Sequence, residues 1–400
     1  MKNKIVIIGG GVVGLATAYQ LLQAGKALNV TVLEKEPGPG GHQTSHNSGV
    51  IHSGLYYKPG SLKALNCIRG YDLLLNFCKN ENIAFDLCGK IVVASDEAEI
   101  PQLEVLWKRG EANGLKGLKL ISESEMKEIE PHVVGKKGIW VPQTGIIAFK
   151  DVAEKLVRKI ESLGGQVLFN QKVVELHSAN GQVTVSTNAS EHQADYLINC
   201  AGLFCDRIAR MMGQNSNVKI IPFRGEYWEL KPERAGLVKN LIYPVPNPNF
   251  PFLGVHFTRM IKGGVELGPN AVLAFKREGY TKLDISLSDL ADVLTWPGFH
   301  KIVKKYWRDG ASEMYRSYSK AAFAKAAQKL IPDVQVSDLV PGGSGVRAQA
   351  CDINGNLLDD FSIVYTENCV HVLNAPSPAA TSSLAIGERI SGEFVKKYLS

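Results

Sequence analysis

The sequence has few of the features that mark disulfide-bonded, metal-binding or repeat proteins. Its seven cysteines are odd in number and form no CxxC pair, which fits reduced thiols in the cytoplasm better than a disulfide framework or a zinc site. No HxxxH or comparable clustered histidine spacing occurs on a plausible helix, so we predict no metal. We find no internal repeat or low-complexity tract. A net charge of +6 spread over 400 residues is too weak to indicate nucleic acid.

A long uncharged stretch near the N-terminus resembles a membrane span or signal peptide only superficially. It runs from Ile5 to Gly25, but four glycines interrupt it and Gln20 and Gln23 lie in its second half. No small-residue cleavage site follows, and no other stretch is long enough to cross a bilayer. With 45% apolar and 21% charged residues, the composition is that of an ordinary globular protein, and the length suggests two domains.

The same stretch has the pattern of a strand, a tight turn and a helix. The β-branched run 4–8 suits a parallel strand that is buried on both faces. Gly9, Gly11 and Gly14 then have the GxGxxG spacing, in which the first glycine permits the turn, the second lets backbone amides approach a pyrophosphate, and the third allows close helix packing. The helix that begins here directs its positive end toward a phosphate.

The context of this motif indicates dinucleotide binding. Residues 29–34 are typical of a second strand and end in Glu34, about 20 positions beyond Gly14, where an acid accepts hydrogen bonds from ribose hydroxyls. This carboxylate disfavours NADP because it would repel the 2′-phosphate. Two later strands, 194–202 and 370–374, each end in small residues and are expected to close the sheet over the cofactor.

The segment from His42 to Tyr57, HQTSHNSGVIHSGLYY, strongly resembles the L-2-hydroxyglutarate oxidase/dehydrogenase family. Further segments across the chain resemble the same family: 222–227, 243–246, 251–257, 268–280, 345–350 and 374–382. The resemblance implies an FAD enzyme of the D-amino-acid-oxidase-like superfamily. Such an enzyme converts L-2-hydroxyglutarate to 2-oxoglutarate by hydride transfer to flavin N5.

The resemblance and the order of expected elements predict an α/β fold with two interleaved domains. A Rossmann-like FAD-binding domain is expected from 1–85, 145–217 and 336–400. An α+β substrate-binding or cap domain, built on an antiparallel sheet, is expected from 86–144 and 218–335. Strand patterns at 218–222 and 226–230 favour that sheet, and 284–330 is mainly helical by its periodicity.

We expect the FAD-binding residues to come from the glycine motif, the acid after the second strand, the loop from His42 and the later family segments. They are Gly9, Gly11, Gly14, Glu34, Ser45, Ser48, Gly49, Gly202, Gly345, Ala379 and Thr381.

Oxidising an alcohol beside a carboxylate requires a base for the hydroxyl proton. His52 has a near-neutral intrinsic pKa that suits this role, and residues 51–54 also resemble a loop of flavin-dependent glycerol-3-phosphate dehydrogenases. The alternative for His52 is a histidine that only hydrogen-bonds the flavin or positions the loop. His256 is the rival base, and its alternative is packing beneath a strand.

A dicarboxylate substrate requires an arginine with bidentate geometry. Arg347 is the first candidate, because residues 345–347 resemble the glycine-x-arginine motif of amino-acid oxidases, although Ala348 replaces the usual proline. Arg224 is a candidate for the distal carboxylate or for the flavin. For both arginines the alternative is a surface or interdomain ion pair. Further substrate-pocket candidates are Arg259, Lys276, Tyr243 and Tyr57.

The electron acceptor is either oxygen or a membrane quinone. Residues 300–329 carry eight lysines and arginines among five aromatic residues, which is usually a solvated basic face. The alternative is peripheral contact with the anionic inner face of a membrane. Two other functions stay open, namely an FAD oxidase of an amino acid or another small 2-hydroxy acid, and an RNA-binding flavoprotein. The second lacks the signature of a known RNA module, so we expect no nucleic-acid partner.

Overall fold

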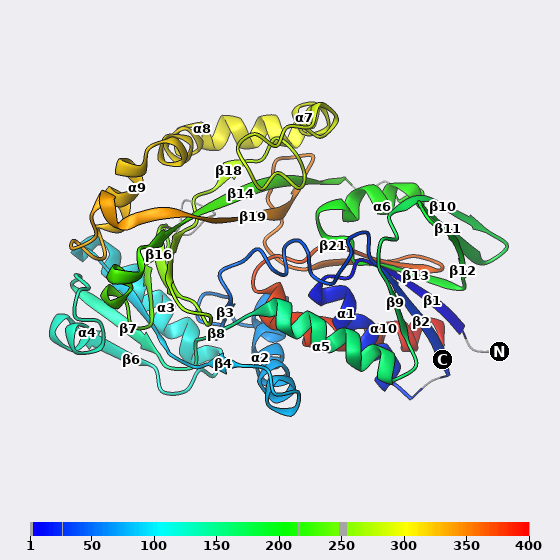
Figure 1. Cartoon of the computed structure of the whole chain (residues 1–400), viewed down its shortest axis with the longest axis horizontal. Coiled ribbons are helices and arrows are strands. Elements are labelled where there is room, and N and C mark those ends of the chain that lie inside the picture. Colours follow the sequence, from blue (N-terminus) through cyan, green and yellow to red (C-terminus); the bar gives the residue numbers. More distant parts are fainter. Residues whose placement is uncertain (1–2, 26, 215–216, 248–253, 400) are drawn as a thin grey trace.

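A computed structural model describes residues 3–25, 27–214, 217–247 and 254–399, and its two main sheets lie in separate halves of the molecule (Figure 1). One half is built on a six-stranded, mainly parallel sheet, and the other on a nine-stranded, mainly antiparallel sheet. The predicted combination of a Rossmann-like α/β part with an antiparallel-sheet part is confirmed.

The six-stranded sheet positions the glycine-rich loop. In spatial order its strands are β20 (Ser362–Tyr365), β21 (Cys369–Asn374), β13 (Tyr196–Asn199), β1 (Asn3–Ile8), β2 (Leu28–Leu33) and β9 (Gln166–Leu168). β1 runs parallel to β2 and β13, whereas the edge strand β20 is antiparallel to β21. The glycine turn therefore lies at the carboxyl end of a central strand, where ligands of open α/β sheets bind.

Both faces of β1 are buried, which explains its run of apolar residues. Ile5 and Ile7 belong to the core beneath four helices, and Val6 and Ile8 belong to a second core on the opposite face. The four helices are α1 (Val12–Gln23), α2 (Leu62–Asn80), α5 (Phe149–Ser162) and α10 (Ala379–Tyr398). The opposite face is covered by β10 (Val173–Ala179), β11 (Gln182–Thr187), β12 (Glu191–Ala194) and α6 (Cys205–Met211).

The nine-stranded sheet forms the other half. Its path is β18 (Val272–Leu273), β14 (Val218–Leu230), β17 (Val265–Gly268), β16 (His256–Arg259), β15 (Leu241–Pro244), β5 (Lys90–Ala94), β7 (Lys137–Val141) and β6 (Lys119–Ser122), with β19 (Leu339–Asp352) paired to β14. One face packs into an apolar core with α4 (Glu123–Ile129) and α9 (Lys320–Ala327). α3 (Ile100–Ala112) packs against β5 and β7 on the other face. On the same face as α3, Leu241 and Tyr243 of β15 pack against Val50 and Ile146 of a separate small sheet.

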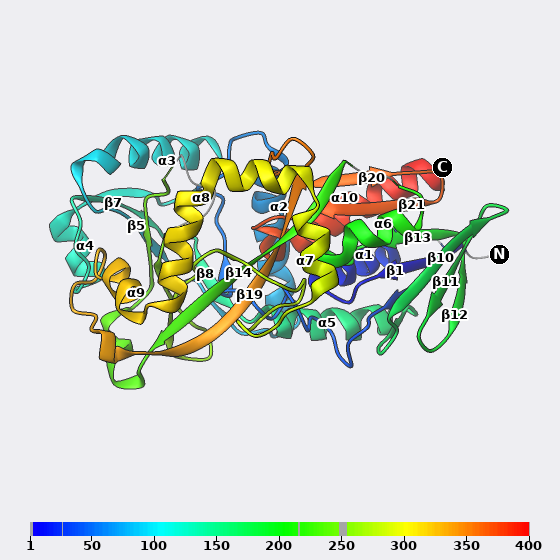
Figure 2. The same ribbon diagram turned by 90° about the horizontal axis from the view of Figure 1, so that it is seen from above.

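A small sheet and a run of helices complete the fold. The sheet consists of β3 (Val50–Ile51), β8 (Gly145–Ile147) and β4 (Phe85–Asp86). The helical prediction for 284–330 is confirmed by α7 (Leu287–Leu294), α8 (Pro297–Tyr318) and α9, and Figure 2 shows α8 passing over the long β14–β19 pair. Short 3-10 turns lie at Glu97–Glu99, Gly202–Phe204, Pro232–Leu237 and Val336–Asp338. None of the helices that the structure describes is long and apolar enough to cross a membrane.

The strand patterns at 218–222 and 226–230 are confirmed and lie in one strand, β14, in which Pro222 and Gly225 both pair with β19. One domain assignment in this half needs correction. Residues 339–352 were assigned to the FAD-binding segment 336–400, but β19 pairs with β14 along nearly its whole length and belongs to the nine-stranded sheet. The remaining domain boundaries stay a prediction.

Candidate active site

A cavity of about 1470 Å³ is lined by residues from both halves of the molecule. The glycine-rich loop and the segment from His42 to His52 form one part of its wall, and β14, β15, β16 and β19 contribute residues to the other. This volume exceeds that of an ordinary small-molecule pocket, which is about 300–1,000 Å³. The cavity therefore has room for a dinucleotide together with a small substrate.

The glycine-rich loop has the geometry of a pyrophosphate cradle. Gly9 has a φ of +112°, and a Cβ there would collide with the carbonyl oxygen of Cys200. A Cβ at Gly14 would collide with the carbonyl oxygen of Gly9. Gly11 is the N-cap of α1, and both Gly11 and Val12 line the cavity, so the positive end of the helix lies at the cavity wall. Gly9, Gly11 and Gly14 all line the cavity, as predicted.

Glu34 lies at the end of β2 and lines the cavity near this loop. Its Oε2 accepts a hydrogen bond from the Gly10 amide at 2.6 Å, and its Oε1 accepts one from the Glu36 amide at 2.9 Å. The carboxylate is thus held in a fixed orientation beside the cradle. Sequence reasoning missed Thr44, whose Oγ1 accepts from the Val12 amide at 3.0 Å and ties the segment from His42 to the start of α1.

The predicted cofactor residues separate into those that line the cavity and those behind its wall. Ser48, Gly202, Gly345 and Ala379 line it, as do the three glycines of the motif and Glu34. Ser45, Gly49 and Thr381 are not among its lining residues.

Each of these three residues has a role in holding the wall instead. The hydroxyl of Ser45 donates to the carbonyl oxygen of Gly40 at 2.6 Å. Gly49 has a φ of +64°, and its carbonyl oxygen accepts from the Ile147 amide at 2.8 Å. Oγ1 of Thr381 accepts from the His52 amide at 3.1 Å and donates to the Val50 carbonyl at 3.3 Å. The loop that carries His52 is therefore fixed from behind.

Both candidate bases line the cavity. Burial, followed by the positive charge of Lys90, lowers the pKa of His52 to about 3. Burial also lowers the pKa of His256 to about 3, with smaller contributions from the charges of Arg347 and Lys90. Nδ1 of His256 lies 2.8 Å from the carbonyl oxygen of Gly254, so it carries the proton and Nε2 keeps its lone pair. Both imidazoles are neutral at physiological pH, as a proton acceptor must be.

The cavity face of the nine-stranded sheet is polar along two rows of residues that run across its strands. Tyr243 and His256 are neighbours in one row, with ring centroids 4.0 Å apart. In the next row, Thr258 is opposite Leu241, which in turn is opposite Lys90 on β5. Apolar residues at the alternating positions face the core beneath the sheet. The pleat of the sheet thus brings together polar side chains that are far apart in the sequence.

The arginine candidates differ in position. Arg347, on β19, lines the cavity, and its charge acts on His256 and Tyr243. Arg224 is buried and donates from Nε and Nη2 to Glu226 at 3.1 and 2.9 Å. Arg259 forms an ion pair with Asp86. Neither Arg224 nor Arg259 lines the cavity, and the structure therefore gives them structural contacts instead of the expected substrate contact.

The tyrosine candidates lie in the cavity wall, whereas Lys276 does not line it. The hydroxyl of Tyr243 hydrogen-bonds to Thr258 and Ser48, and burial raises its pKa to about 12. Tyr57 hydrogen-bonds to Ser377. Both phenols are protonated at neutral pH and act as hydrogen-bonding groups.

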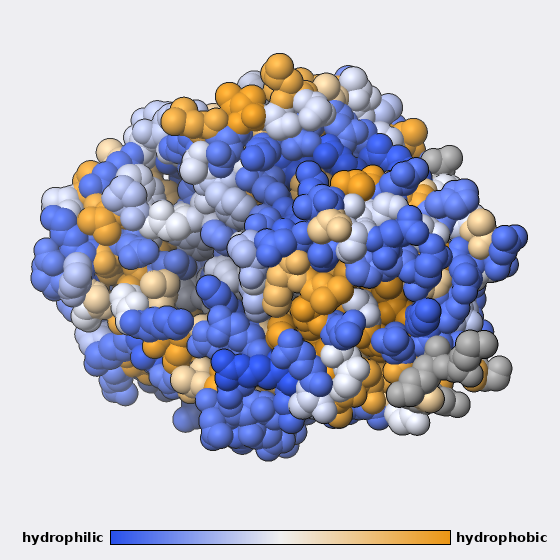
Figure 3. All heavy atoms as spheres, turned by 45° about the vertical axis from the view of Figure 1, so that its right-hand side comes forward, coloured by the Kyte–Doolittle hydropathy of each residue, from blue (hydrophilic) through white to orange (hydrophobic). Residues whose placement is uncertain are grey.

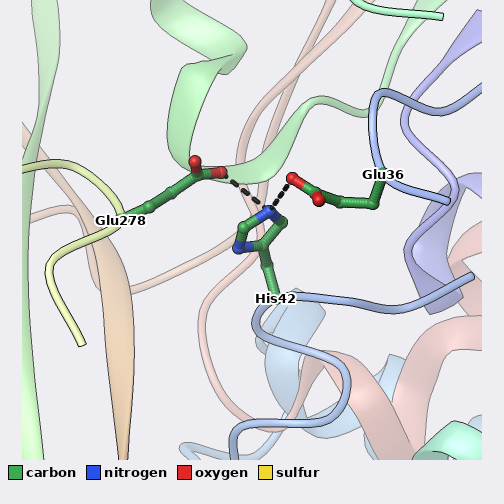
Figure 4. Close-up of side chains that lie close together, drawn as sticks. All are labelled: Glu36, His42 and Glu278. Carbon is green, nitrogen blue, oxygen red and sulfur yellow. Dashed lines mark hydrogen bonds and ion pairs between the residues drawn. The ribbon is translucent and has the colours of Figure 1, made fainter. Parts of the chain in front are cut away.

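A charged cluster of Lys35, Glu36, His42 and Glu278 connects the two halves at one end of the cavity. Nε2 of His42 lies 2.9 Å from Glu36 and 3.0 Å from Glu278, as Figure 4 shows. Among the described residues, this group of two acids and a histidine has the spacing of metal ligands. The ammonium of Lys35, however, is 2.9 Å from Glu36 and 2.5 Å from Glu278 and already supplies a cation. The prediction of no metal stays a prediction.

Comparison with known proteins identifies the class. The family model described as FAD dependent oxidoreductase (DAO) matches residues 4–392, so the chain belongs to this family of flavin enzymes, and its cofactor is FAD. The glycine cradle and Glu34 have the arrangement that a dinucleotide requires, which agrees with FAD as the cofactor. A solved structure, the FAD-bound L-alpha-glycerophosphate oxidase from Mycoplasma pneumoniae, has the same fold, with a TM-score of 0.79 at 23% identity over 99% of this chain and 95% of that one.

Curated relatives narrow the class. A protein from Indibacter alkaliphilus named L-2-hydroxyglutarate dehydrogenase is 56% identical over 100% of both chains. One of the same name from Escherichia coli is 46% identical over 96% of this chain and 91% of its own. The resemblance to the L-2-hydroxyglutarate oxidase/dehydrogenase family is confirmed.

Proposed function

We propose that this protein oxidises L-2-hydroxyglutarate to 2-oxoglutarate with bound FAD. The observation that carries the proposal is the joint placement of Arg347 and two neutral histidines on a cavity that also contains the dinucleotide cradle. The names of relatives with up to 56% identity favour this substrate. A 2-hydroxy acid requires an arginine for its carboxylate and a base for its hydroxyl, and the cavity provides both.

In the proposed reaction, Arg347 holds the carboxylate next to the reacting carbon by two parallel hydrogen bonds. A neutral histidine, either His256 or His52, accepts the hydroxyl proton, and Tyr243 narrows the space around the substrate. The FAD supplies a hydride acceptor at flavin N5, so the C–H pair leaves as hydride while the oxygen forms the new C=O bond. The lone pair on Nε2 of His256 makes this residue a well-defined proton acceptor.

We further propose that Gly9, Gly11, Gly14 and Glu34 contact the pyrophosphate and ribose of FAD. Ser48, Gly202, Gly345 and Ala379 are proposed to line the remainder of the cofactor site. Ser45, Gly49 and Thr381 would act indirectly, through the hydrogen bonds that hold the loop.

For the electron acceptor we propose a membrane quinone in preference to oxygen, with a cytoplasmic protein that rests on the inner face of the membrane. Large apolar side chains are exposed along residues 283–318, including Leu283 at 90%, Leu287 at 80% and Tyr318 at 68%. Figure 3 shows apolar atoms among hydrophilic ones along the upper edge, where α7 and α8 run. Lysines and arginines accompany them, as in surfaces that bind anionic lipid. Of the five aromatic residues in 300–329, Phe323 does not belong to this surface, because it is buried in the core.

Two measurements test the acceptor and the surface. The wild-type protein should co-sediment with vesicles containing anionic lipid and lose this binding when Leu283 and Leu287 are changed to Ser. A soluble quinone should reoxidise the reduced flavin faster than air-saturated buffer does. Faster reoxidation by oxygen, with no vesicle binding, would contradict both proposals.

Anaerobic bleaching of the flavin tests the substrate. We expect rapid bleaching by L-2-hydroxyglutarate and slow or no bleaching by its D-enantiomer, by glycerol 3-phosphate and by L- and D-amino acids. Bleaching by an amino acid instead would establish the alternative activity, an amino-acid oxidase on the same fold.

A further inference from the structure

The proposed substrate is a dicarboxylate, and Arg347 accounts for only one of its two charged ends. The two other arginines expected at the substrate have partners elsewhere: Arg224 is bound to Glu226, and Arg259 to Asp86. Leaving the distal carboxylate without a partner in a partly closed cavity would be costly. Another donor or cation in the cavity wall must therefore serve this end of the molecule.

Lys90 is an unusual residue behind that wall. It is 1% exposed on β5, and its side chain is on the face of the nine-stranded sheet that also carries Tyr243 and His256. Among the described residues, its ammonium has no carboxylate partner. It lies 4.4 Å from the ring centroid of Tyr56 and 4.9 Å from that of Tyr243, so two aromatic rings replace the counter-ion. Buried lysines are usually paired, which makes this one a candidate functional residue.

Tyr56 separates Lys90 from the cavity. Tyr56 lines the cavity, and its hydroxyl is buried without a hydrogen-bond partner among the described residues. Its main chain is fixed, because Nη1 of Arg109 donates to its carbonyl oxygen at 3.1 Å. By contrast, the hydroxyl of Tyr243 already has Thr258 and Ser48 as partners. A buried hydroxyl without a partner requires one, and a ligand oxygen would provide it.

Positive charges from two different strands act on the histidines. The charges of Arg347 and of Lys90 both act on His256, while Lys90 also acts on His52. Arg347 on β19 thus lines the cavity and Lys90 on β5 lies behind its wall, with the candidate bases near both. Lys63, which also lines the cavity, adds a further charge near His52. A ligand with a carboxylate at each end matches this distribution of charge better than one with a single carboxylate does.

We propose that Tyr56 and Lys90 form the subsite for the second carboxylate of the substrate, an inference that rests on the proposed function. The hydroxyl of Tyr56 donates a hydrogen bond to the carboxylate. The ammonium of Lys90, behind the rings, supplies the compensating charge and polarises the phenol, which strengthens its hydrogen bond. Lys90 is thus a positioning residue that acts through Tyr56.

The subsite predicts a pH dependence. Burial lowers the pKa of Lys90 to about 7 in the absence of substrate, and the groups that face it are Cys67, His52, Tyr56, Tyr243 and His256. Because the charged form exists below this pKa, kcat/KM for a dicarboxylate should fall as the pH rises through about 7. A monocarboxylate substrate does not use the subsite, and its kcat/KM should lack this decrease.

The test compares two variants on a pair of dicarboxylates and a pair of monocarboxylates. Tyr56→Phe removes one hydroxyl, and Lys90→Met removes the charge while keeping most of the volume. We expect kcat/KM for L-2-hydroxyglutarate, and binding of 2-oxoglutarate followed by the flavin spectrum, to weaken about tenfold to hundredfold, the range for a hydrogen bond to a charged group. The kcat/KM for L-2-hydroxybutyrate and the affinity for 2-oxobutyrate should change less than about threefold. Tyr19→Phe and Lys137→Met, remote from the cavity, are the matched controls.

The outcomes separate the subsite from the proposed function. If L-2-hydroxyglutarate does not reduce the flavin of the wild-type protein, the proposed function fails. If it does, but Tyr56→Phe affects the dicarboxylates and the monocarboxylates equally or affects neither, the subsite is wrong. Should Lys90→Met not fold, Tyr56→Phe alone decides, because loss of one hydroxyl leaves the core packing intact. In Lys90→Met the decrease above pH 7 should also disappear, a change that a purely structural role would not produce.

Discussion

The pyrophosphate cradle and the polar face of the nine-stranded sheet contribute to the same cavity in different ways. The cradle is made by backbone within one continuous segment, where glycines are required because a Cβ at Gly9 or Gly14 would collide with main-chain oxygen. The polar face is made by side chains from β14, β15, β16 and β19, with Lys90 of β5 behind the cavity wall, and these strands together span more than 250 positions of the chain. Local spacing determines the first, and strand register determines the second.

This difference has a consequence for substitutions. A change in the cradle acts on backbone geometry and should abolish cofactor binding altogether. A change on the polar face removes one side chain from an otherwise intact wall and should affect a single step. The predictions below test this contrast in order of decreasing effect.

The largest effect is expected for Gly14→Val. Its side chain would collide with the carbonyl oxygen of Gly9 and push α1 away from the turn. We expect the purified protein to retain less than about a tenth of its flavin, since close helix–strand packing at this glycine is needed for the cradle. The ratio of flavin to protein absorbance measures this. Gly38→Ala, where a Cβ would meet open space, is the control and should bind FAD normally. A Gly14→Val protein that retains its flavin would contradict this prediction.

The next effect concerns the base. His256→Asn and His52→Asn should both keep FAD, and the one that removes the base should slow anaerobic flavin reduction by about 10²–10⁴-fold. Because both histidines have a pKa of about 3, neither should produce an acid limb between pH 5 and 9. Stopped-flow absorbance gives the rates. Equal, small losses in both variants would mean that the proton leaves by another route.

A smaller effect is expected at the substrate carboxylate. Arg347→Lys keeps the charge but loses the bidentate geometry, so kcat/KM should fall about tenfold to hundredfold, mainly through KM. Arg259→Lys is the informative comparison, since Arg259 pairs with Asp86 outside the cavity, and its kcat/KM should stay within about threefold. Steady-state kinetics on the holoenzyme measure both. A greater loss in Arg259→Lys than in Arg347→Lys would restore the role expected from the sequence.

The smallest effect is expected for the charged cluster of Lys35, Glu36, His42 and Glu278. Burial opposes protonation of His42, but hydrogen bonds and charges from Glu278 and Glu36 raise its pKa overall. Its ion pairs therefore stabilise the fold fully below the unfolded pKa of about 6.5, and this stabilisation is lost as the pH rises through the higher folded pKa. The difference in unfolding free energy between the wild type and His42→Gln should be about 1 kcal/mol or less and shrink toward alkaline pH. Denaturant unfolding measures it, with the exposed His177→Gln as control. A difference independent of pH would exclude the ion pairs as its cause.

Much of the nucleotide end could be predicted because its signals are local. Gly9, Gly11, Gly14 and Glu34 have fixed spacing within one strand–turn–helix–strand unit, and all four line the cavity. Thr44 was missed because a threonine that caps a helix from 32 positions away leaves no pattern in the sequence. Ser45, Gly49 and Thr381 were expected to bind the cofactor, but their position behind the wall depends on packing.

The substrate end was only partly predictable. The sequence pointed to His52, His256 and Arg347, which the fold brings to one cavity. Arg224 and, as a weaker candidate, Arg259 were also expected at the substrate, because an arginine in a strand has no local mark that says whether its partner is a substrate or a carboxylate of the protein. Only pairing across the sheet and the positions of Glu226 and Asp86 decide this.

By itself, the sequence determined the dinucleotide fold, the acid beside it and the family, since each depends on residues whose spacing is set along one segment of chain. The tertiary structure alone decided which of the predicted arginines line the cavity, placed Lys90 behind Tyr56 without a carboxylate partner among the described residues, and added β19 to the antiparallel sheet. The physical reason is that strand register and helix packing bring together residues far apart in the sequence, and burial then sets their charge and hydrogen bonding.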